Sequence, residues 1–332
     1  MLSERRKACI YGGALGDALG YKVEFMSTTR IRDEWGDQGI TLAKCDGVLE
    51  VSDDTQMTLF TIEAISDVQF NDYKNNTGSG GQNYRLFSRL RLAYLDWLET
   101  QDKAHKDIVG LLAHEPLLRK QQVPGFTCLE ALRKGARGTV AKPVNSSKGC
   151  GGVMRVAPLG VWLEGGTDRW HFKLGRDAAA ITHGHPDGYL PGGAMVLLIK
   201  LILNDFEWND AIERVLKQFP ITDGDESHTA VLLKNVLQLV ASKKAHTDCM
   251  SELGEGWTGD EALAIGLYAA MVSDTFEGCI ELAANHDGDS DSTASIAGQL
   301  YGAKHGMKVI PADAIERLDV IKPLRDVMRR CF

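Results

Sequence analysis

A short acidic stretch, NHDGDSDSTASI at positions 285–296, holds residues well suited to chemistry. Within seven positions it places three aspartates, Asp287, Asp289 and Asp291, and ends on two adjacent hydroxyls, Ser292 and Thr293. Carboxylates this close raise one another's pKa and oppose folding unless they are solvated, hydrogen-bonded or neutralised by a cation. The stretch is therefore a solvated turn, a metal site or a loop that carries an aspartyl nucleophile.

Two known loop types share part of this pattern. An EF-hand loop that began at Asp287 would have its aspartates in place, but it requires Gly and Glu where this chain has Ser292 and Gly298. Asp289 to Thr293 spells the DxDST nucleophile loop of haloacid-dehalogenase-type phosphatases. That loop must follow a hydrophobic strand, whereas GCIELAANH (278–286) has the pattern of a helix end. We expect neither loop type.

A second acidic stretch, VSDDTQMTLFTIEAI at 51–65, has a similar form. In both stretches aspartates and hydroxyls stand at the start of a predicted helix, where capping fixes the side chains and the helix dipole favours negative charge. Two such helix starts facing each other would make a cage of oxygen ligands that suits Mg²⁺ or Mn²⁺. The alternative is that each aspartate only caps its own helix.

The elements that must position these stretches are predicted to be helices, because apolar residues recur at spacings of three and four. Strand signals are limited to short stretches such as 47–51. We therefore predict an all-α fold. The helical faces are Leu86, Leu90, Ala93 and Trp97; Leu232, Val236, Leu239 and Val240; and Phe276, Ile280 and Ala283.

Other local patterns refine this picture. Thr127 and Glu130 have the spacing of a capping box, which predicts a helix start. Residues 192–203 are apolar on nearly all sides, which indicates a helix buried in the core. The polar, glycine-rich residues 71–83 are expected to form a loop. Since no linker separates two halves, we expect a single domain over 1–332.

One helical face near the start of the chain lacks side chains. Gly12, Gly16 and Gly20 recur every four residues, which lets another backbone approach closely. The segment is short and carries Asp17, so we expect tight packing in a soluble core and not dimerisation in a membrane.

Composition narrows the class of protein. The chain has 332 residues, of which 44% are hydrophobic, enough for a substantial core. Its net charge of −8 argues against nucleic acid as the main partner. The seven cysteines are scattered without a CxxC pair, as expected of free thiols. No apolar run reaches the roughly 18 residues that span a bilayer, and the first residues lack the apolar core of a secretory signal, so we expect a cytoplasmic protein.

Four motifs together resemble the ADP-ribosylglycohydrolase family, which includes the dinitrogenase-reductase-activating glycohydrolase and eukaryotic ADP-ribosylhydrolases. The resemblance covers most of the chain and implies a compact, single-domain orthogonal helical bundle. It also implies a centre of two divalent cations and hydrolysis of the glycosidic bond that joins ADP-ribose to a modified group. The motifs are GALGDALGYKVEF (13–25), SDDTQMTL (52–59), GCGGVMRVAPLG with THGHP (149–160 and 182–186), and DGDSDSTASIAGQLYGA (287–303).

The resemblance also implies roles for individual residues. Glu24 matches a glutamate beside the metals, and either Glu24 or Asp54 is expected to move the proton of the attacking water. Asp287 lies outside the family's ligand set; it either supports the ligands from behind or is solvated without a role. The implied metal ligands are Ser52, Asp53, Asp54, Asp289, Asp291 and Ser292.

The implied substrate-binding residues lie in the third motif and around Trp257. The glycines of GCGGVMR would let backbone N–H groups reach a pyrophosphate, although such a turn can also be purely structural. The family often has Asn where this chain has Cys150. The resemblance places His183 near the phosphates, whereas His185 is read as structural; Trp257 lies near the ribose or leaving group unless it only packs in the core. The set is Gly149, Gly151, Gly152, Val153, Met154, His183 and Trp257.

Together these expectations describe a hydrolase that depends on Mg²⁺ or Mn²⁺ and removes ADP-ribose from a protein side chain. Arginine is the favoured linkage, because many family members act there. The alternative is a non-catalytic protein of the same fold that binds ADP-ribose or an ADP-ribosyltransferase.

Overall fold

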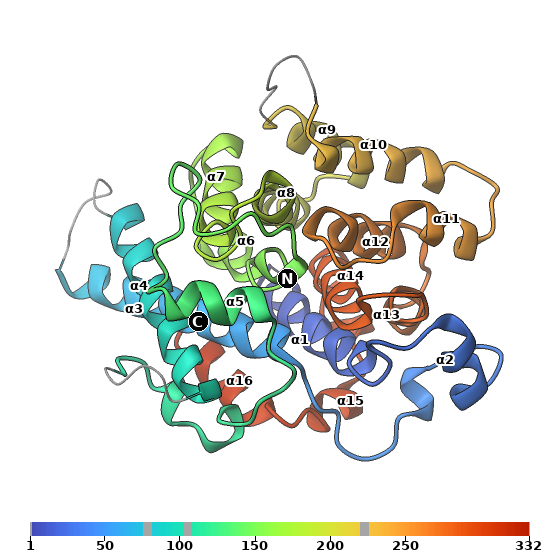
Figure 1. Ribbon diagram of the computed structural model, residues 1–332, viewed down its shortest axis with the longest axis horizontal. Helices are drawn as coiled ribbons and strands as arrows, with labels where there is room; N and C mark the ends of the chain where they lie inside the picture. The colour runs from blue at the N-terminus through green and yellow to red at the C-terminus, as the bar shows by residue number, and fades with distance from the viewer. Residues whose placement is uncertain (1, 76–81, 103–107, 220–225, 332) are drawn as a thin grey trace.

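The computed structural model describes residues 2–75, 82–102, 108–219 and 226–331, and these form sixteen α-helices (Figure 1). Over these ranges there is no β-strand, only isolated bridges such as that between Leu49 and Leu318. The predicted all-α fold is confirmed. The helices are α1 (Leu2–Gly20), α2 (Thr28–Trp35), α3 (Asp53–Asn75), α4 (Gln82–Asp102), α5 (Phe126–Arg133), α6 (Ala157–Trp162), α7 (Asp168–Ala179), α8 (Pro186–Leu203), α9 (Trp208–Leu216), α10 (His228–Val240), α11 (His246–Leu253), α12 (Gly259–Val272), α13 (Phe276–Ala284), α14 (Ser290–His305), α15 (Ala312–Glu316) and α16 (Ile321–Arg329).

The two helices that carry the first and last motifs pack along each other at the centre of the molecule (Figure 1). The glycine face of α1 lies directly on the backbone of α14: a Cβ added at Gly16 would stand 2.0 Å from the carbonyl oxygen of Ala294. A Cβ at Gly20 would stand 2.1 Å from that of Ser290. The predicted close approach is confirmed, and its partner is the helix that begins at the second acidic stretch.

The remaining helices cover this central pair. The apolar faces predicted in α4, α10 and α13 are buried, apart from the partly exposed Val240. A single cluster of buried apolar side chains draws on residues from α1 to α16. The single-domain organisation of 1–332 stays a prediction.

Helix α8 is the core helix expected from residues 192–203. Contrary to expectation, this helix of 18 residues is long and apolar enough to cross a membrane, judged by length and composition alone. However, 89% of it is buried inside the protein. Burial of this kind is typical of a core helix.

Two local predictions were wrong. Helix α5 begins at Phe126 with Gly125 as its N-cap, so Thr127 is not the cap; its hydroxyl instead lies 3.0 Å from that of Ser147. Of the loop expected at 71–83, residues 71–75 continue α3 and α4 begins at Gln82, while 76–81 lie outside the described residues. Polarity alone does not end a helix, because a solvated helical face is also polar.

Candidate active site

The first acidic cluster, formed by Ser52, Asp53 and Asp54, stands at the start of α3. The Ser52 hydroxyl accepts a hydrogen bond of 3.2 Å from the Asp54 amide, as expected of a capping serine. The carboxylate of Asp17, fully buried in α1, accepts two more, from the amides of Ser52 (2.9 Å) and Thr55 (3.0 Å). A side chain of α1 therefore caps the N-terminus of α3 and fixes the position of the first acidic cluster.

The second acidic cluster, formed by Asp289, Asp291 and Ser292, stands at the start of α14. Asp289 is the N-cap, and its Oδ1 accepts from the Ser292 amide at 3.2 Å. Gly288 precedes it with φ of 132°, and a Cβ there would collide with the carbonyl of Glu255. Because α13 and not a strand leads into this turn, the stretch is not a phosphatase-type nucleophile loop, as expected.

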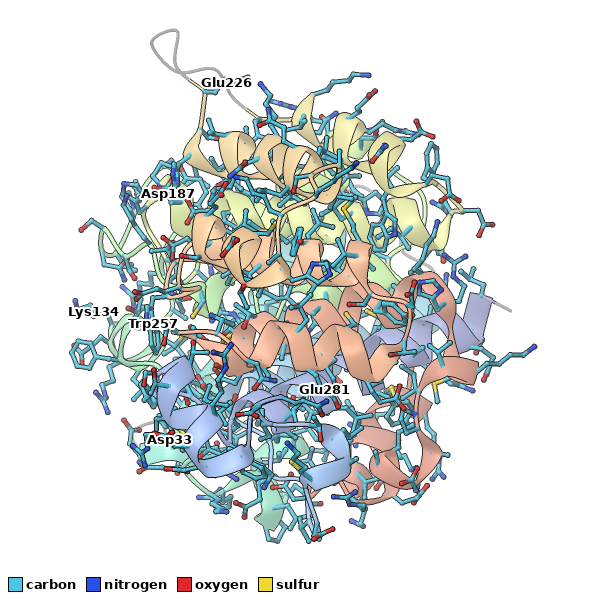
Figure 2. The ribbon with its side chains drawn as sticks, turned by 90° about the vertical axis from the view of Figure 1, so that its right-hand side faces the viewer. Asp33, Lys134, Asp187, Glu226, Trp257 and Glu281 are labelled. Atoms are coloured by element: carbon cyan, nitrogen blue, oxygen red, sulfur yellow. The ribbon has the colours of Figure 1, made fainter. Side chains whose placement is uncertain are left out.

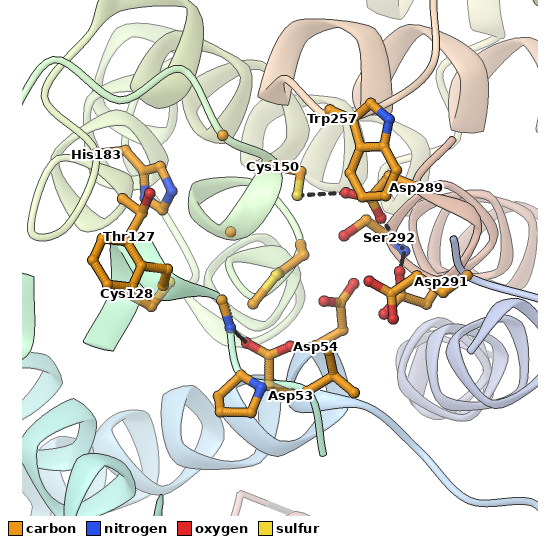
Figure 3. A pocket seen from close by; sticks show the side chains of 18 of the residues that line it. Asp53, Asp54, Thr127, Cys128, Cys150, His183, Trp257, Asp289, Asp291 and Ser292 are labelled. Atoms are coloured by element: carbon orange, nitrogen blue, oxygen red, sulfur yellow. Dashed lines mark hydrogen bonds between the residues drawn. The ribbon is translucent and has the colours of Figure 1, made fainter. Parts of the chain in front are cut away.

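The two clusters face each other across one cavity of about 310 Å³ (Figure 3). Glu24, just after α1, lines the same cavity. Ser52 does not line it: the residue is fully buried and its hydroxyl is turned to the helix start. The cavity thus gathers five of the six expected metal ligands with Glu24: Asp53, Asp54, Asp289, Asp291 and Ser292.

Burial and mutual repulsion perturb these carboxyl groups. Burial, followed by the charge of Asp291, raises the pKa of Glu24 to about 10. Burial also raises the pKa of Asp53 to about 8, although a hydrogen bond of 3.1 Å from the Gly125 amide partly offsets it. The same two causes as for Glu24 hold the pKa values of Asp54 and Asp289 well above their usual range. So many carboxyl groups ionise together only beside a compensating positive charge.

The donor set fits a hard divalent cation. The Oδ2 atom of Asp54 is buried and accepts no hydrogen bond from the described residues. Carboxylate and hydroxyl oxygens are the ligands that Mg²⁺ and Mn²⁺ prefer. Asp287, by contrast, accepts a hydrogen bond of 2.6 Å from the Thr28 amide at the start of α2 and does not line the cavity. That Asp287 is not a metal ligand stays a prediction.

The glycine-rich motif forms a wall of the cavity next to the acidic clusters. Gly149, Gly151 and Met154 line the cavity, and so does His183. Gly152 and Val153 do not: a Cβ on Gly152 would stand 2.6 Å from the carbonyl oxygen of Gly188, and Val153 is fully buried. These two residues support the turn from behind.

His185, the second histidine of THGHP, has the structural role expected of it. It is the N-cap of α8, and its Nδ1 accepts a hydrogen bond of 3.1 Å from the Asp187 amide. It is not among the residues that line the cavity.

Exposed aromatic rings surround the mouth of the cavity. Trp257 lies at the surface (Figure 2) and stacks on Phe25 with ring centroids 5.5 Å apart and planes at 21°. The side chains are 38% and 63% exposed, so Trp257 is not a core residue. Phe126, on the same cavity, is 76% exposed. Sequence patterns did not predict Phe25 or Phe126; the only signal was the position of Phe25 next to Glu24.

Cys150 stands at the boundary between the glycine-rich turn and the second acidic cluster. Its thiol donates to Oδ2 of Asp289 at 2.7 Å, and burial raises its pKa well above the usual range. The thiol therefore stays neutral and lies beside a candidate metal ligand.

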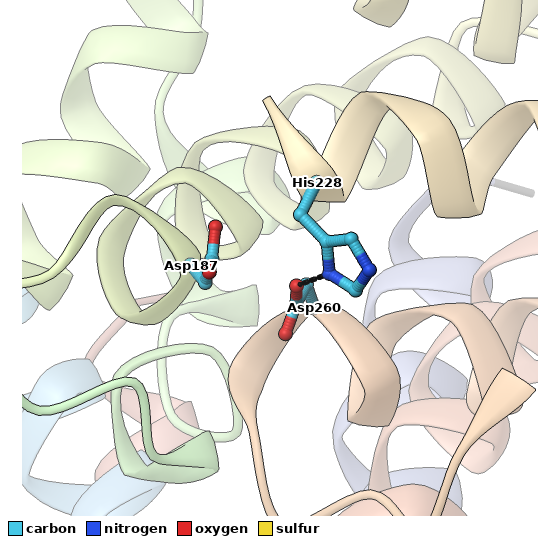
Figure 4. A group of neighbouring side chains, drawn as sticks. All are labelled: Asp187, His228 and Asp260. Atoms are coloured by element: carbon cyan, nitrogen blue, oxygen red, sulfur yellow. Dashed lines mark hydrogen bonds and ion pairs between the residues drawn. The ribbon is translucent and has the colours of Figure 1, made fainter. Parts of the chain in front are cut away.

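A separate group of three side chains, Asp187, His228 and Asp260, comes from the starts of α8, α10 and α12 (Figure 4). Their potential ligand atoms lie within 4.8 Å of one another. Both carboxylates already have partners: Asp260 pairs with His228 at 2.6 Å, and Asp187 pairs with Lys148 at 2.9 Å. Because Lys148 precedes the glycine-rich turn, this group anchors that turn to the two helix starts.

Comparisons with known proteins agree with this arrangement. A family model described as ADP-ribosylglycohydrolase matches residues 1–332. The chain is 26% identical to an uncharacterised protein of Archaeoglobus fulgidus, over 91% of this chain and 88% of that one. It is 23% identical to the ADP-ribosyl-[dinitrogen reductase] glycohydrolase of Rhodospirillum rubrum, over 98% and 94%. A solved structure titled ADP-ribosylglycohydrolase-related protein complex shares the fold, with a TM-score of 0.63 at 22% identity and coverage of 99% and 97%.

Proposed function

Because the chain belongs to the ADP-ribosylglycohydrolase family, we propose that it is a hydrolase that depends on divalent cations and removes ADP-ribose from modified protein side chains. The observation that carries this proposal is the convergence of two acidic helix starts and a glycine-rich turn on one cavity. The acidic clusters suit cations that hold the ribose, and the turn offers backbone amides to a diphosphate.

Two divalent cations, Mg²⁺ or Mn²⁺, would be held by Asp53, Asp54, Asp289, Asp291 and Ser292, with Ser52 supporting the helix start. Such cations supply Lewis acidity for the ribose hydroxyls and lower the pKa of the attacking water. The buried, unpartnered Oδ2 of Asp54 supports its role as a ligand.

Glu24 is the group that we propose to carry the proton. It lies outside the two helix starts, it is only partly buried, and its pKa is raised to about 10. A carboxyl group that holds its proton in the free protein can give it to a leaving group, or take one from water once cations lower its pKa. Nearby carboxylates would stabilise the positive charge that develops on the sugar.

The leaving group is proposed to be the guanidinium of arginine. No lysine or arginine is among the described residues that line the cavity, so no protein cation would repel a guanidinium there. The exposed, stacked rings of Phe25 and Trp257 at its mouth offer aromatic faces, which attract planar cations. A serine hydroxyl is neutral and would be attracted less strongly to these aromatic faces.

The direct test is to incubate the protein with arginine-ADP-ribosylated and serine-ADP-ribosylated proteins, in Mg²⁺, in Mn²⁺ and in EDTA. We expect release of ADP-ribose from arginine with a divalent cation and none in EDTA. If neither linkage is cleaved although ADP-ribose binds, the protein is a non-catalytic binder and the hydrolase proposal fails for these linkages.

A further inference from the structure

Three buried side chains behind the glycine-rich turn form a hydrogen-bonded chain that ends at the cavity. Nη2 of Arg155 lies 2.6 Å from Oγ1 of Thr182, and the same Oγ1 lies 2.9 Å from Nδ1 of His183. Arg155 and Thr182 are fully buried, and His183 is 1% exposed. No bulk water therefore competes for these hydrogen bonds.

The direction of each hydrogen bond follows from the chemistry of the groups. A guanidinium can only donate, so Thr182 must accept from Arg155. The single proton of the Thr182 hydroxyl then goes to the best acceptor within reach. Cys128, which also receives a hydrogen bond from Arg155 at 3.2 Å, offers a sulfur, and sulfur is a weak acceptor. The imidazole nitrogen is the stronger one.

We propose that Arg155 and Thr182 are positioning residues that hold His183 as the neutral tautomer with its proton on Nε2, so that His183 is a fixed hydrogen-bond donor to an anionic oxygen of the ligand. The choice of a diphosphate as that ligand rests on the proposed function; the tautomer itself does not.

The surroundings of Nε2 agree with this role. Nε2 faces the cavity wall: it would stand 3.3 Å from a Cβ added at Gly149 and 3.4 Å from one at Gly151, and both glycines line the cavity with His183. No described protein group accepts a hydrogen bond from Nε2, so its N–H is available to donate to a ligand oxygen. Burial and the charge of Arg155 lower the pKa of His183 to about 3. The ring therefore donates without carrying a charge and without acting as a base at neutral pH.

The first test reads the tautomer in the free, full-length protein. Long-range proton–nitrogen NMR spectra of protein labelled at histidine distinguish the two tautomers and the charged ring, and the His183→Gln variant identifies the signal. We expect the Nε2–H pattern throughout the range from about pH 5 to 8 in which histidines ordinarily titrate. An Nδ1–H pattern, or an imidazolium near pH 6, would overturn the proposal.

The second test uses a matched pair of variants. Thr182→Val removes the hydroxyl at nearly constant shape, whereas Thr182→Ser keeps it. We expect Thr182→Val to lose the single tautomer and to bind ADP-ribose about 10-fold more weakly or worse, as for one lost hydrogen bond to an anion. Thr182→Ser should match the wild type in both. Equal tautomer and affinity in all three proteins would contradict the proposal.

The two tests separate this proposal from the proposed function. If wild-type protein shows the Nε2–H tautomer but binds no ADP-ribose, the proposed function fails, and inorganic pyrophosphate then serves as the anionic probe. The His183 signal should shift when pyrophosphate is added. An unchanged signal would contradict the donor role. Should Thr182→Val fail to fold, the wild-type spectrum and Thr182→Ser still decide the tautomer.

Discussion

Asp54 and Asp289 are the side chains on which the proposed metal centre depends most. They come from helix starts more than two hundred residues apart in the sequence, and both line the cavity. We predict that Asp54→Asn and Asp289→Asn each lose divalent-cation binding and turnover, because an amide cannot supply the negative charge that offsets a cation. Metal analysis after dialysis, with an activity assay, measures both effects, and the helical circular dichroism spectrum should not change.

Asp287 provides the control, since it belongs to the same acidic stretch but only accepts a hydrogen bond at the start of α2. Asp287→Ala should keep cation binding and lose about 1 kcal/mol of stability, as is usual for a lost cap. Cation binding that falls equally in Asp287→Ala and Asp289→Asn would show that charge density alone, and not the assigned ligands, holds the ions.

The raised carboxyl pKa values give the protein a pH dependence of stability when a chelator is present. Asp53 keeps its proton up to about pH 8 in the folded chain, whereas an unfolded aspartate ionises near pH 4. The folded state thus binds more protons between these values, so the free energy of unfolding falls as the pH rises from about 4 to 8. Each such group contributes a slope of about 1.4 kcal/mol per pH unit.

Denaturant unfolding in EDTA at several pH values measures this slope. Asp53→Asn should flatten it, and saturating Mn²⁺ should flatten it further because cation binding ionises the cluster. Stability in EDTA that is constant or increases across this range would contradict the assignment of buried, protonated carboxyl groups.

At the scale of elements, the glycine face of α1 sets the position of the second acidic cluster. A helical Gly→Ala change ordinarily stabilises, because Ala has the higher helix propensity. At Gly16 the new Cβ would stand 2.0 Å from the Ala294 carbonyl oxygen, so α1 and α14 must separate. We predict that Gly16→Ala lowers the free energy of unfolding by about 1–3 kcal/mol, as for overpacked cores, and weakens cation affinity.

Gly278→Ala in α13 is the matched control, because its added Cβ would meet only the Thr275 hydroxyl, at 3.0 Å. Thermal unfolding and cation titration of the two variants compare them directly. If Gly16→Ala is as stable as Gly278→Ala, close packing of α1 on α14 does not position the cluster.

Helix α3 depends in a similar way on Asp17. Asp17→Ala removes the acceptor of two amide hydrogen bonds and leaves the Ser52 and Thr55 amides buried without partners. Unsatisfied buried amides cost about 1–3 kcal/mol each, so we predict a marked loss of stability together with weaker cation binding. Asp17→Asn, which keeps one acceptor oxygen, should lie between Ala and wild type in both measurements. Wild-type cation affinity in Asp17→Ala would contradict the capping role.

The sequence predicted helix faces well and their partners poorly. Residues such as Leu90 and Trp97 recur at the helical period. This period is a local property of the chain, so it does not depend on how the helices pack together. Glycine spacing at Gly12, Gly16 and Gly20 predicted a close approach but not α14 as the partner. A helix face without side chains does not indicate which other helix packs on it. The capping box at Thr127 failed because its hydroxyl bonds to Ser147, a tertiary contact without a local signal.

The site shows the same division. Charge crowding in 287–293 and its counterpart at 52–54 led to five residues that line the cavity, whereas Ser52 and Asp287 do not line it. Phe25 and Phe126 were missed, since exposed aromatics at a cavity mouth follow no periodicity. Asp17 was noted only as a charge that argues against a membrane helix; its role as a cap depends on a helix 35 residues away in sequence.

At the scale of the whole molecule, the cations are predicted to stabilise the fold as well as the reaction. The cavity joins α3 and α14 with the turn after α1, so a ligand that binds only the folded state raises the free energy of unfolding. At a cation concentration about 100 times its dissociation constant, the gain is about 2.7 kcal/mol. The melting temperature should therefore rise with Mn²⁺ in the wild type and stay constant in Asp289→Asn. An equal rise in both would place the stabilising cation elsewhere.

Release of ADP-ribose from an arginine-ADP-ribosylated protein, followed for the wild type and Asp289→Asn with and without Mn²⁺, tests the central claim most directly. We predict release by the wild type with Mn²⁺, none after chelation, recovery when the cation is restored, and none from Asp289→Asn under any of these conditions. Release that continues in chelator, or that Asp289→Asn supports at the wild-type rate, would contradict a cation-dependent hydrolase built on the two acidic clusters.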